Sequence, residues 1–443
     1  MQLHGKIAST LLVSISLLIS GCGGSSGSSS GGGSTPPSTP STANEWTWVG
    51  GSSTANAPGV YGIEGVPAAT NIPGGRYDAV SWIDGSGNFW LFGGADAVGS
   101  EFNDLWEFSP TTKTWTWMSG IYAAGNAGGI YGTLGVASTG NVPGARYYST
   151  SWTDGSGNLW LFGGFGYVPN GTDGYLNSLW EYSPSAKTWT WVSGSNTVPQ
   201  QGQSPPGVYG TQGVASVSNT PGGRDGAVSW TDSSGNLWLF GGSGYGSNGT
   251  WGELNDLWEF NPTAKTWTWV SGSSTGNAAG VYGAQGVAAT GNCPGGRDSA
   301  ASWIDTGGNL WLFGGEGYGS TGGMAVGLND LWEFSPTTKT WTWMTGSSTA
   351  GSAGVYGTLG VASASNTPGG RESAARWTDT SGNFWLFGGD TNPALAQSDL
   401  WEFNPTAKTW TWVSGSSTEN AVAVYGTLEP VMSFDRVHKL NFP

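Results

Sequence analysis

The sequence predicts an all-β protein in which one four-stranded unit is repeated, and three observations support this prediction. Each unit contains the same order of short β-rich runs separated by turn residues. Outside residues 1–21, no segment shows the 3.6-residue apolar period of a helix. The string Trp-Thr-Trp recurs along the chain, beginning at Trp46, Trp115, Trp189, Trp267, Trp341 and Trp410.

Within each complete copy, the four strands can be placed in order. The first follows Pro-Gly-Gly-Arg or Pro-Gly-Ala-Arg and ends in Trp-Ile-Asp or Trp-Thr-Asp. A tight turn leads to the second, as at Phe89–Gly94, and a loop of variable length leads to the third, as at Asp104–Phe108. The fourth is the Trp-Thr-Trp strand. Alternation of Trp, Leu, Phe and Thr is typical of two-sided strands, and four antiparallel strands per unit predict the blades of a β-propeller.

These marks resemble the kelch repeat over residues 46–413. The diglycine after the second strand, the Trp-Glu of the third and the Trp of the fourth carry the resemblance. It implies a kelch-type β-propeller with five complete four-stranded blades, although the period is longer than the roughly 50 residues of a kelch unit. Trp46–Val49 is a lone fourth strand. The sequence leaves open whether five blades close with this extra strand, whether a sixth blade is incomplete, or whether the reading frame is truncated or shifted.

Composition excludes several classes of protein. The 443 residues include 14 Lys and Arg against 29 Asp and Glu, which disfavours nucleic-acid binding. Two Cys exclude a disulfide scaffold, and two His argue against metal sites built on several histidines. We therefore expect no metal and no cofactor, and a monomeric protein.

The N-terminus has the features of an export signal. Residues 1–21 combine Lys6 with a short apolar stretch, and Ile19–Cys22 resembles the lipobox of bacterial lipoproteins. The resemblance implies lipidation of Cys22 and an exported, lipid-anchored protein at the bacterial outer membrane or cell surface; the alternative is an ordinary secretory signal with a chance Cys. Residues 22–43 are a Gly/Ser/Pro-rich flexible tether. The propeller follows at 44–430 and a divergent tail at 431–443.

Residues present in every copy are expected to stabilise the blades. The aspartate of the first turn, as at Asp84, is expected to close that turn with an Asn rather than to bind calcium, which takes about 6–8 oxygens. Cys293 stands where the other copies have Ile, Val or Thr, so we expect a packing role. The repeat arginines should hydrogen-bond loop carbonyls between adjacent blades, although a ring of arginines around an anion is the rival interpretation: Arg76, Arg146, Arg224, Arg297 and Arg371.

Sequence variation indicates which face binds a ligand. The second-to-third loops and the inter-blade segments share one face and carry the variation in length, and function usually lies on variable loops held by a rigid scaffold. Aromatic side chains beside acids suit sugar rings, although packing within the loops is an equal alternative. The candidate ligand-binding residues are Phe165, Tyr167, Tyr175, Tyr245, Trp251, Glu253, Glu316 and Tyr318.

Two functions are compatible with these features. The first is a non-enzymatic binding scaffold for glycans or proteins, exposed at the surface or in the periplasm, with no catalytic residues. The alternative is a carbohydrate-active enzyme similar to kelch mutarotases, with Glu253 and Glu316 as paired acids. Kelch propellers similar to galactose oxidase use a copper site with two His. This chain keeps only His438 after signal removal, so that activity does not carry over.

Overall fold

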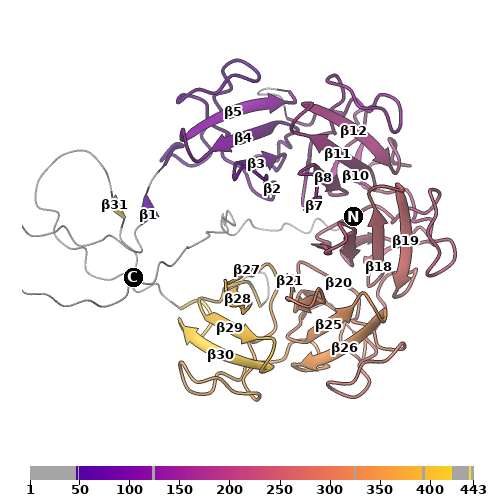
Figure 1. Cartoon of the computed structure of the whole chain (residues 1–443), viewed down its shortest axis with the longest axis vertical. Coiled ribbons are helices and arrows are strands. Elements are labelled where there is room, and N and C mark those ends of the chain that lie inside the picture. The colour runs from indigo at the N-terminus through magenta and orange to yellow at the C-terminus, as the bar shows by residue number, and fades with distance from the viewer. Residues whose placement is uncertain are drawn as a thin grey trace, which may run out of the picture.

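The computed structural model describes residues 46–47, 49–121, 125–323, 326–391, 395–421 and 439–440. All regular elements in these ranges are β-strands. They include five four-stranded antiparallel sheets arranged around a common centre (Figure 1), which confirms the predicted propeller and its five complete blades. Among the residues described, no helix has the length and apolarity needed to cross a membrane. The predicted signal and tether lie outside the described residues, as do Cys22 and nearly all of the tail.

The five blades follow one another along the chain, each with its strands in sequence order from the centre outward. Blade 1 contains β2 (Val80–Ile83), β3 (Phe89–Phe92), β4 (Leu105–Ser109) and β5 (Thr114–Ser119). Blade 2 contains β7 (Thr150–Thr153), β8 (Leu159–Phe162), β11 (Leu179–Ser183) and β12 (Thr188–Ser193). Blade 3 contains β14 (Val228–Thr231), β15 (Leu237–Phe240), β18 (Leu257–Asn261) and β19 (Thr266–Ser271).

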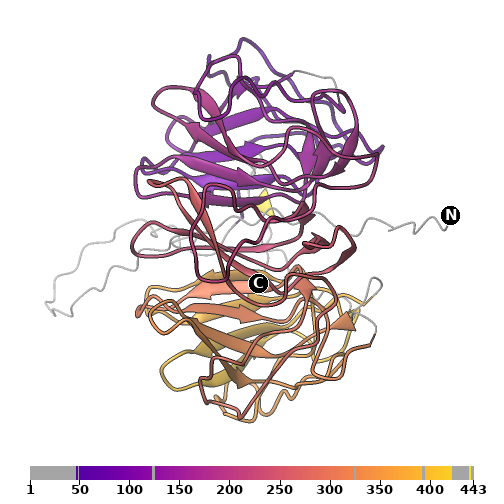
Figure 2. The ribbon, with the colours of Figure 1, turned by 90° about the vertical axis from the view of Figure 1, so that its right-hand side faces the viewer.

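Blade 4 contains β21 (Ala301–Ile304), β22 (Leu310–Phe313), β25 (Leu331–Ser335) and β26 (Thr340–Thr345). Blade 5 contains β27 (Ala375–Thr378), β28 (Phe384–Phe387), β29 (Leu400–Asn404) and β30 (Thr409–Ser414). In the side view, blades 1 and 2 lie at one end, blades 4 and 5 at the other, and blade 3 between them (Figure 2).

Three smaller sheets sit on blades 2, 3 and 4. They were expected to be loops, but each contains a hairpin paired with a two-residue strand at the repeat arginine. On blade 2 these are β6 (Arg146–Tyr147), β9 (Phe165–Tyr167) and β10 (Asp173–Tyr175). On blade 3 they are β13 (Arg224–Asp225), β16 (Ser243–Tyr245) and β17 (Trp251–Glu253). On blade 4 they are β20 (Arg297–Asp298), β23 (Glu316–Gly317) and β24 (Val326–Gly327).

The core is built from tryptophans that pack within and between blades. In blades 1 to 4, the Trp of the first strand donates its indole N–H to a backbone carbonyl of the next blade; in blade 2, Trp152 Nε1 lies 2.9 Å from the Trp238 carbonyl oxygen. Burying such large rings is the main stabilising term of the fold. The largest fully buried side chains are Trp106, Trp160, Trp180, Trp189, Trp238, Trp258, Trp267, Trp311, Trp332, Trp341, Trp401 and Trp410.

The ring of blades is open between blade 1 and blade 5 (Figure 1). Trp377, which holds in blade 5 the position of Trp152 in blade 2, is 37% exposed. The lone N-terminal strand β1 (Trp46–Thr47) joins none of the five blades and pairs instead with β31 (Lys439–Leu440). The described residues therefore contain five blades and a separate two-stranded ribbon.

Candidate functional site

The candidate site lies on one face of the propeller, which we call the loop face. Its framework is the pairing of each two-residue strand with the hairpin that follows the second strand of the same blade. In blade 3, Arg224 lies opposite Gly244, and Tyr245 lies opposite Trp251. The second-to-third loops and the ends of the inter-blade segments therefore share a face, as predicted.

The repeat arginines are buried beneath this face and serve its structure. Arg224 Nε donates to the Gly222 carbonyl at 3.0 Å and Nη1 to the Gly241 carbonyl at 2.9 Å. The prediction that the fork joins adjacent blades is wrong, because these carbonyls belong to the arginine's own blade. The inter-blade link is made by the backbone instead: Gly164 N–H donates to the Arg224 carbonyl at 2.8 Å. The rival interpretation of an arginine-lined anion ring does not fit side chains that are buried and bonded within separate blades.

The partner of these arginines is an aspartate that sequence reasoning did not single out. Arg224 binds Asp256 through both ends of its fork, with Nη1–Oδ1 at 2.6 Å and Nη2–Oδ2 at 2.8 Å. The same pair recurs as Arg76–Asp104, Arg297–Asp330 and Arg371–Asp399. The signal was present, since an aspartate directly precedes the third strand in four of the five copies; blade 2 has Ser178 at this position.

Around the common centre, the residues two positions after the repeat arginines link the blades. Their φ angles are all positive, and each donates its backbone N–H to the carbonyl of the preceding one, as from Tyr148 to Asp78 at 3.1 Å and from Ser373 to Ser299 at 2.9 Å. These bonds hold the residues that directly follow the repeat arginines close together at the centre. Those residues differ in chemistry between blades: Tyr77, Tyr147, Asp225, Asp298 and Glu372.

Five aromatic rings form a continuous row across blades 1 to 3, which we call the aromatic row. Its centroid distances, in order, are 6.3, 5.8, 5.2 and 5.7 Å. Three members were predicted site residues, whereas the two tyrosines after the repeat arginines were missed, although their position in the repeat was a signal. The aromatic row consists of Tyr77, Tyr147, Phe165, Tyr175 and Tyr245.

The other predicted residues surround this row unevenly. Trp251 lies opposite Tyr245 and is 50% exposed. Tyr167 lines a shallow hollow between the blade 2 hairpin and the next inter-blade segment. Tyr318 is half-buried on blade 4. Glu253 is not at the surface, because it is 7% exposed and accepts a hydrogen bond from Ser243 Oγ at 2.6 Å.

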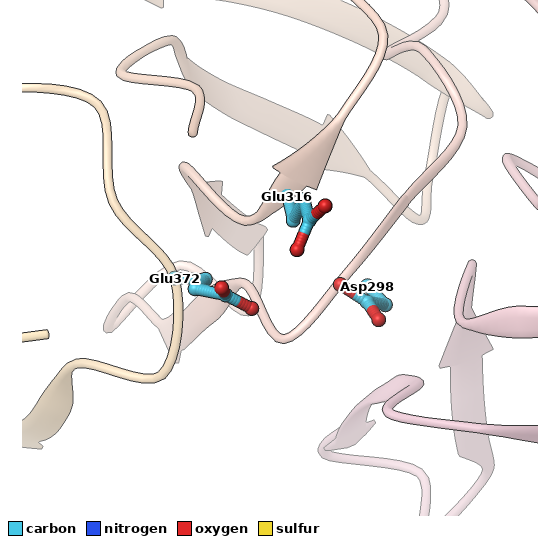
Figure 3. A group of neighbouring side chains, drawn as sticks. All are labelled: Asp298, Glu316 and Glu372. Carbon is cyan, nitrogen blue, oxygen red and sulfur yellow. The ribbon is translucent and has the colours of Figure 1, made fainter. Parts of the chain in front are cut away.

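On the blade 4 and 5 side, three carboxylates converge, and we call them the acidic group (Figure 3): Asp298, Glu316 and Glu372. Asp298 lies opposite Glu316 in the β20–β23 pair. Each residue offers one oxygen within 4.8 Å of the others, a spacing that could hold a metal ion. Only Glu316 was a predicted site residue.

Burial raises the pKa of Asp298 well above its usual range, and the nearby carboxylates raise it further. This direction of the pKa shift favours the protonated carboxyl of Asp298, which lessens the repulsion among the three carboxyl groups. Tyr148, whose ring centroid lies 5.8 Å from that of Tyr147 in the aromatic row, is close enough to the acidic group to interact with it. Burial and then the charges of Asp78, Glu372 and Asp298 raise the pKa of Tyr148.

The structural interpretations of two other repeated positions are confirmed. Asp84 accepts hydrogen bonds from Ser86 and Asn88 and so closes its turn. The Cys293 thiol is buried, which raises its pKa to about 12 and leaves it unreactive at neutral pH.

A family model described as the KLHDC2/KLHL20/DRC7 Kelch-repeats domain matches residues 214–426, which include blades 3, 4 and 5. Comparison with curated proteins gives no match. Together, the family match and the five repeated four-stranded sheets identify the fold as a kelch-repeat β-propeller.

Proposed function

We propose that this kelch-repeat β-propeller is a non-enzymatic binding scaffold whose ligand lies on the loop face. Propellers of this kind are typically protein-interaction scaffolds. The observation that carries the proposal is the aromatic row, because its rings come from three blades and are only half-buried or exposed. Rings needed only for packing would be covered as the core tryptophans are, whereas rings left accessible on a rigid framework suit recognition.

The negative charge on the loop face limits which classes of ligand can bind there. Asp173 and Glu372 lie on the same side as the aromatic row, while the repeat arginines are buried. A polyanionic ligand would be repelled. Two ligand classes fit: a protein segment bearing Lys or Arg, and a neutral or cationic glycan whose sugar rings stack on the aromatic row.

Binding measurements on the full chain test this proposal and separate the two classes. We expect binding on an array of neutral and amino-sugar glycans or on a panel of basic peptides. Binding to a basic peptide should weaken steeply with salt, whereas stacking of a neutral sugar should not. Failure of both panels would contradict the proposal.

Variants on the two faces locate the binding surface. Tyr175→Ala and Trp251→Ala remove rings from the loop face, and an anchor of this kind contributes about 2 kcal/mol, or roughly 30-fold in affinity. Phe89→Ala is the matched control, because Phe89 stacks on Phe108 beside the first turn of blade 1, at the opposite face. Equal losses in all three variants would place the ligand elsewhere.

We further propose that a lipid on Cys22 anchors the scaffold to a bacterial membrane. Support comes from the lipobox-like Ile19–Cys22 and the Gly/Ser/Pro-rich composition of residues 22–43. Metabolic labelling with a fatty acid should mark the wild type but not Cys22→Ser. Equal labelling of both proteins would exclude this anchor.

The enzymatic alternative has one observation in its favour. Asp298, whose pKa is raised by burial, lies beside the carboxyl groups of Glu316 and Glu372, and clustered carboxyl groups are used in general acid–base catalysis. A sugar mutarotase needs no more than this. Mutarotation that is present in the wild type and lost in Asp298→Asn would support the alternative, and absence of turnover across common sugars would reject it.

A further inference from the structure

Blade 2 differs from its sister blades at one buried point beneath the loop face. In blades 1, 3, 4 and 5 the aspartate that directly precedes the third strand accepts three hydrogen bonds at Oδ2. In blade 3 these come from Tyr209 Oη at 2.5 Å, Trp258 Nε1 at 2.7 Å and Arg224 Nη2 at 2.8 Å. A single carboxylate oxygen therefore satisfies three buried donors in each of these four blades.

Blade 2 keeps all three donors but has no carboxylate. Arg146, Tyr131 and Trp180 occupy the donor positions, while Ser178 replaces the aspartate. Arg146 Nη2 and Trp180 Nε1 have no acceptor among the described residues. The residues carrying them are 1% and 0% exposed, so solvent does not reach these groups.

The serine hydroxyl compensates for only part of the loss. Tyr131 Oη lies 3.2 Å from Ser178 Oγ, and Arg146 Nη1 lies 3.3 Å from the same atom. Both bonds are longer than their counterparts in the sister blades. There the tyrosine hydroxyl lies 2.5–2.7 Å from the aspartate, and the arginine Nη1 lies 2.6 Å from it. Arg146 Nη2 and Trp180 Nε1, whose counterparts in blade 3 bond to the aspartate Oδ2, remain unsatisfied, which is rare for fully buried groups.

The charge of Arg146 is also uncompensated. Burial lowers the pKa of Arg146, whereas the aspartates raise the pKa of Arg76, Arg224 and Arg297 despite the same burial. The carboxylate that acts electrostatically on Arg146 is Glu101. Burial raises the pKa of Glu101 to about 8, so it is mostly uncharged at neutral pH.

We propose that blade 2 binds a small monovalent anion of the size of chloride where Oδ2 lies in the sister blades. Its ligands are Arg146 Nη2 and Trp180 Nε1, while the Tyr131 hydroxyl donates to Ser178 Oγ. Serine is smaller than aspartate by one carbon and one oxygen, so the space suits a single-atom ion and not phosphate or sulfate. A water molecule would accept the hydrogen bonds but would leave the guanidinium charge unbalanced, and a buried charge requires a counter-charge.

Thermal unfolding of the full chain tests this site. Chloride is exchanged for gluconate at constant ionic strength, so that only specific binding contributes. The Tm of the wild type should rise with the logarithm of chloride concentration above the dissociation constant. Ser178→Asp supplies the missing carboxylate, so its Tm should be higher without chloride and should lose this dependence.

Blade 3 offers the matched control. Asp256→Ser recreates the blade 2 arrangement around Arg224, Tyr209 and Trp258, so this variant should depend on chloride more steeply than the wild type. Identical chloride responses of the wild type and Ser178→Asp would overturn the proposal. If Ser178→Asp does not fold, the wild type alone decides through anomalous scattering from crystals grown in bromide. A bromide peak beside Arg146 Nη2 and Trp180 Nε1 would support the site, and its absence would overturn it.

Discussion

At one end of blade 1 a carboxylate closes a turn, and at the other end a carboxylate lies buried near the loop face. Asp84 accepts hydrogen bonds from Ser86 N, Asn88 N and Trp90 Nε1 at 2.8, 3.0 and 2.9 Å. Burial alone would raise its pKa, but these bonds outweigh burial and lower it. Among the described residues, none donates a hydrogen bond to Glu101 Oε2. Burial raises the pKa of Glu101 to about 8. The comparison teaches that donors can outweigh the effect of burial on a carboxylate, and the buried Asp104 agrees, because Arg76, Trp106 and Tyr61 lower its pKa despite burial.

The largest expected effect comes from removing donors from a buried aspartate. Arg224→Ala leaves Asp256 as an uncompensated charge, with both side chains 0% exposed in the wild type. We expect a loss of about 3–5 kcal/mol in the free energy of unfolding, measured by urea denaturation. A loss below about 1 kcal/mol would mean that Asp256 becomes protonated at little cost, and donors would then matter less than we infer.

Glu101 tests the opposite end of the blade through pH. It binds a proton more tightly in the folded protein, at a pKa of about 8, than in the unfolded chain, at about 4.3. The stability that protonated Glu101 contributes is therefore complete below pH of about 4 and is lost as pH rises to about 8. Over this range the free energy of unfolding falls by at most about 1.4 kcal/mol per pH unit. Glu101→Gln should match the wild type near pH 4 and exceed it at pH 8 in urea midpoint. Parallel profiles would contradict the assignment.

The turn aspartate should contribute less than the buried pair. Asp84→Ala removes the acceptor of the Ser86, Asn88 and Trp90 hydrogen bonds, and we expect a loss of about 1–3 kcal/mol in the free energy of unfolding. Asp84→Asn keeps one acceptor oxygen and should lose less. Equal losses in the two variants would show that the charge, and not the number of accepted bonds, is what matters at this turn.

The smallest effect is expected at an exposed ion pair between blades. Lys265 Nζ lies 3.0 Å from Glu181 Oε2 and 4.5 Å from the centre of the Trp160 ring, and its side chain is 43% exposed. Lys265→Ala should cost less than about 1 kcal/mol in unfolding free energy. The difference from the wild type should shrink in high salt; a large effect that does not respond to salt would instead indicate lost packing on Trp160.

Many residues of the loop face could be predicted from the sequence, but which of them lie together could not. Variation in loop length pointed to the loop face, and Phe165, Tyr175 and Tyr245 are brought together there. Tyr77 and Tyr147 were missed because they follow the repeat arginines, where the regular pattern suggests a structural role. Asp298 and Glu372 were missed because they are far apart in the chain and meet only at the centre of the ring.

The sequence by itself determined the strand order, the five blades and the repeated turns, because each blade is built from local hairpins whose patterns are visible in one copy. Only the tertiary structure decided which buried groups find partners. Arg146 and Arg224 occupy the same position in their copies, yet the first lacks the carboxylate that the second binds. A charge and its counter-charge more than 30 residues apart in the chain are paired by folding, so their match or mismatch appears only when the strands are assembled.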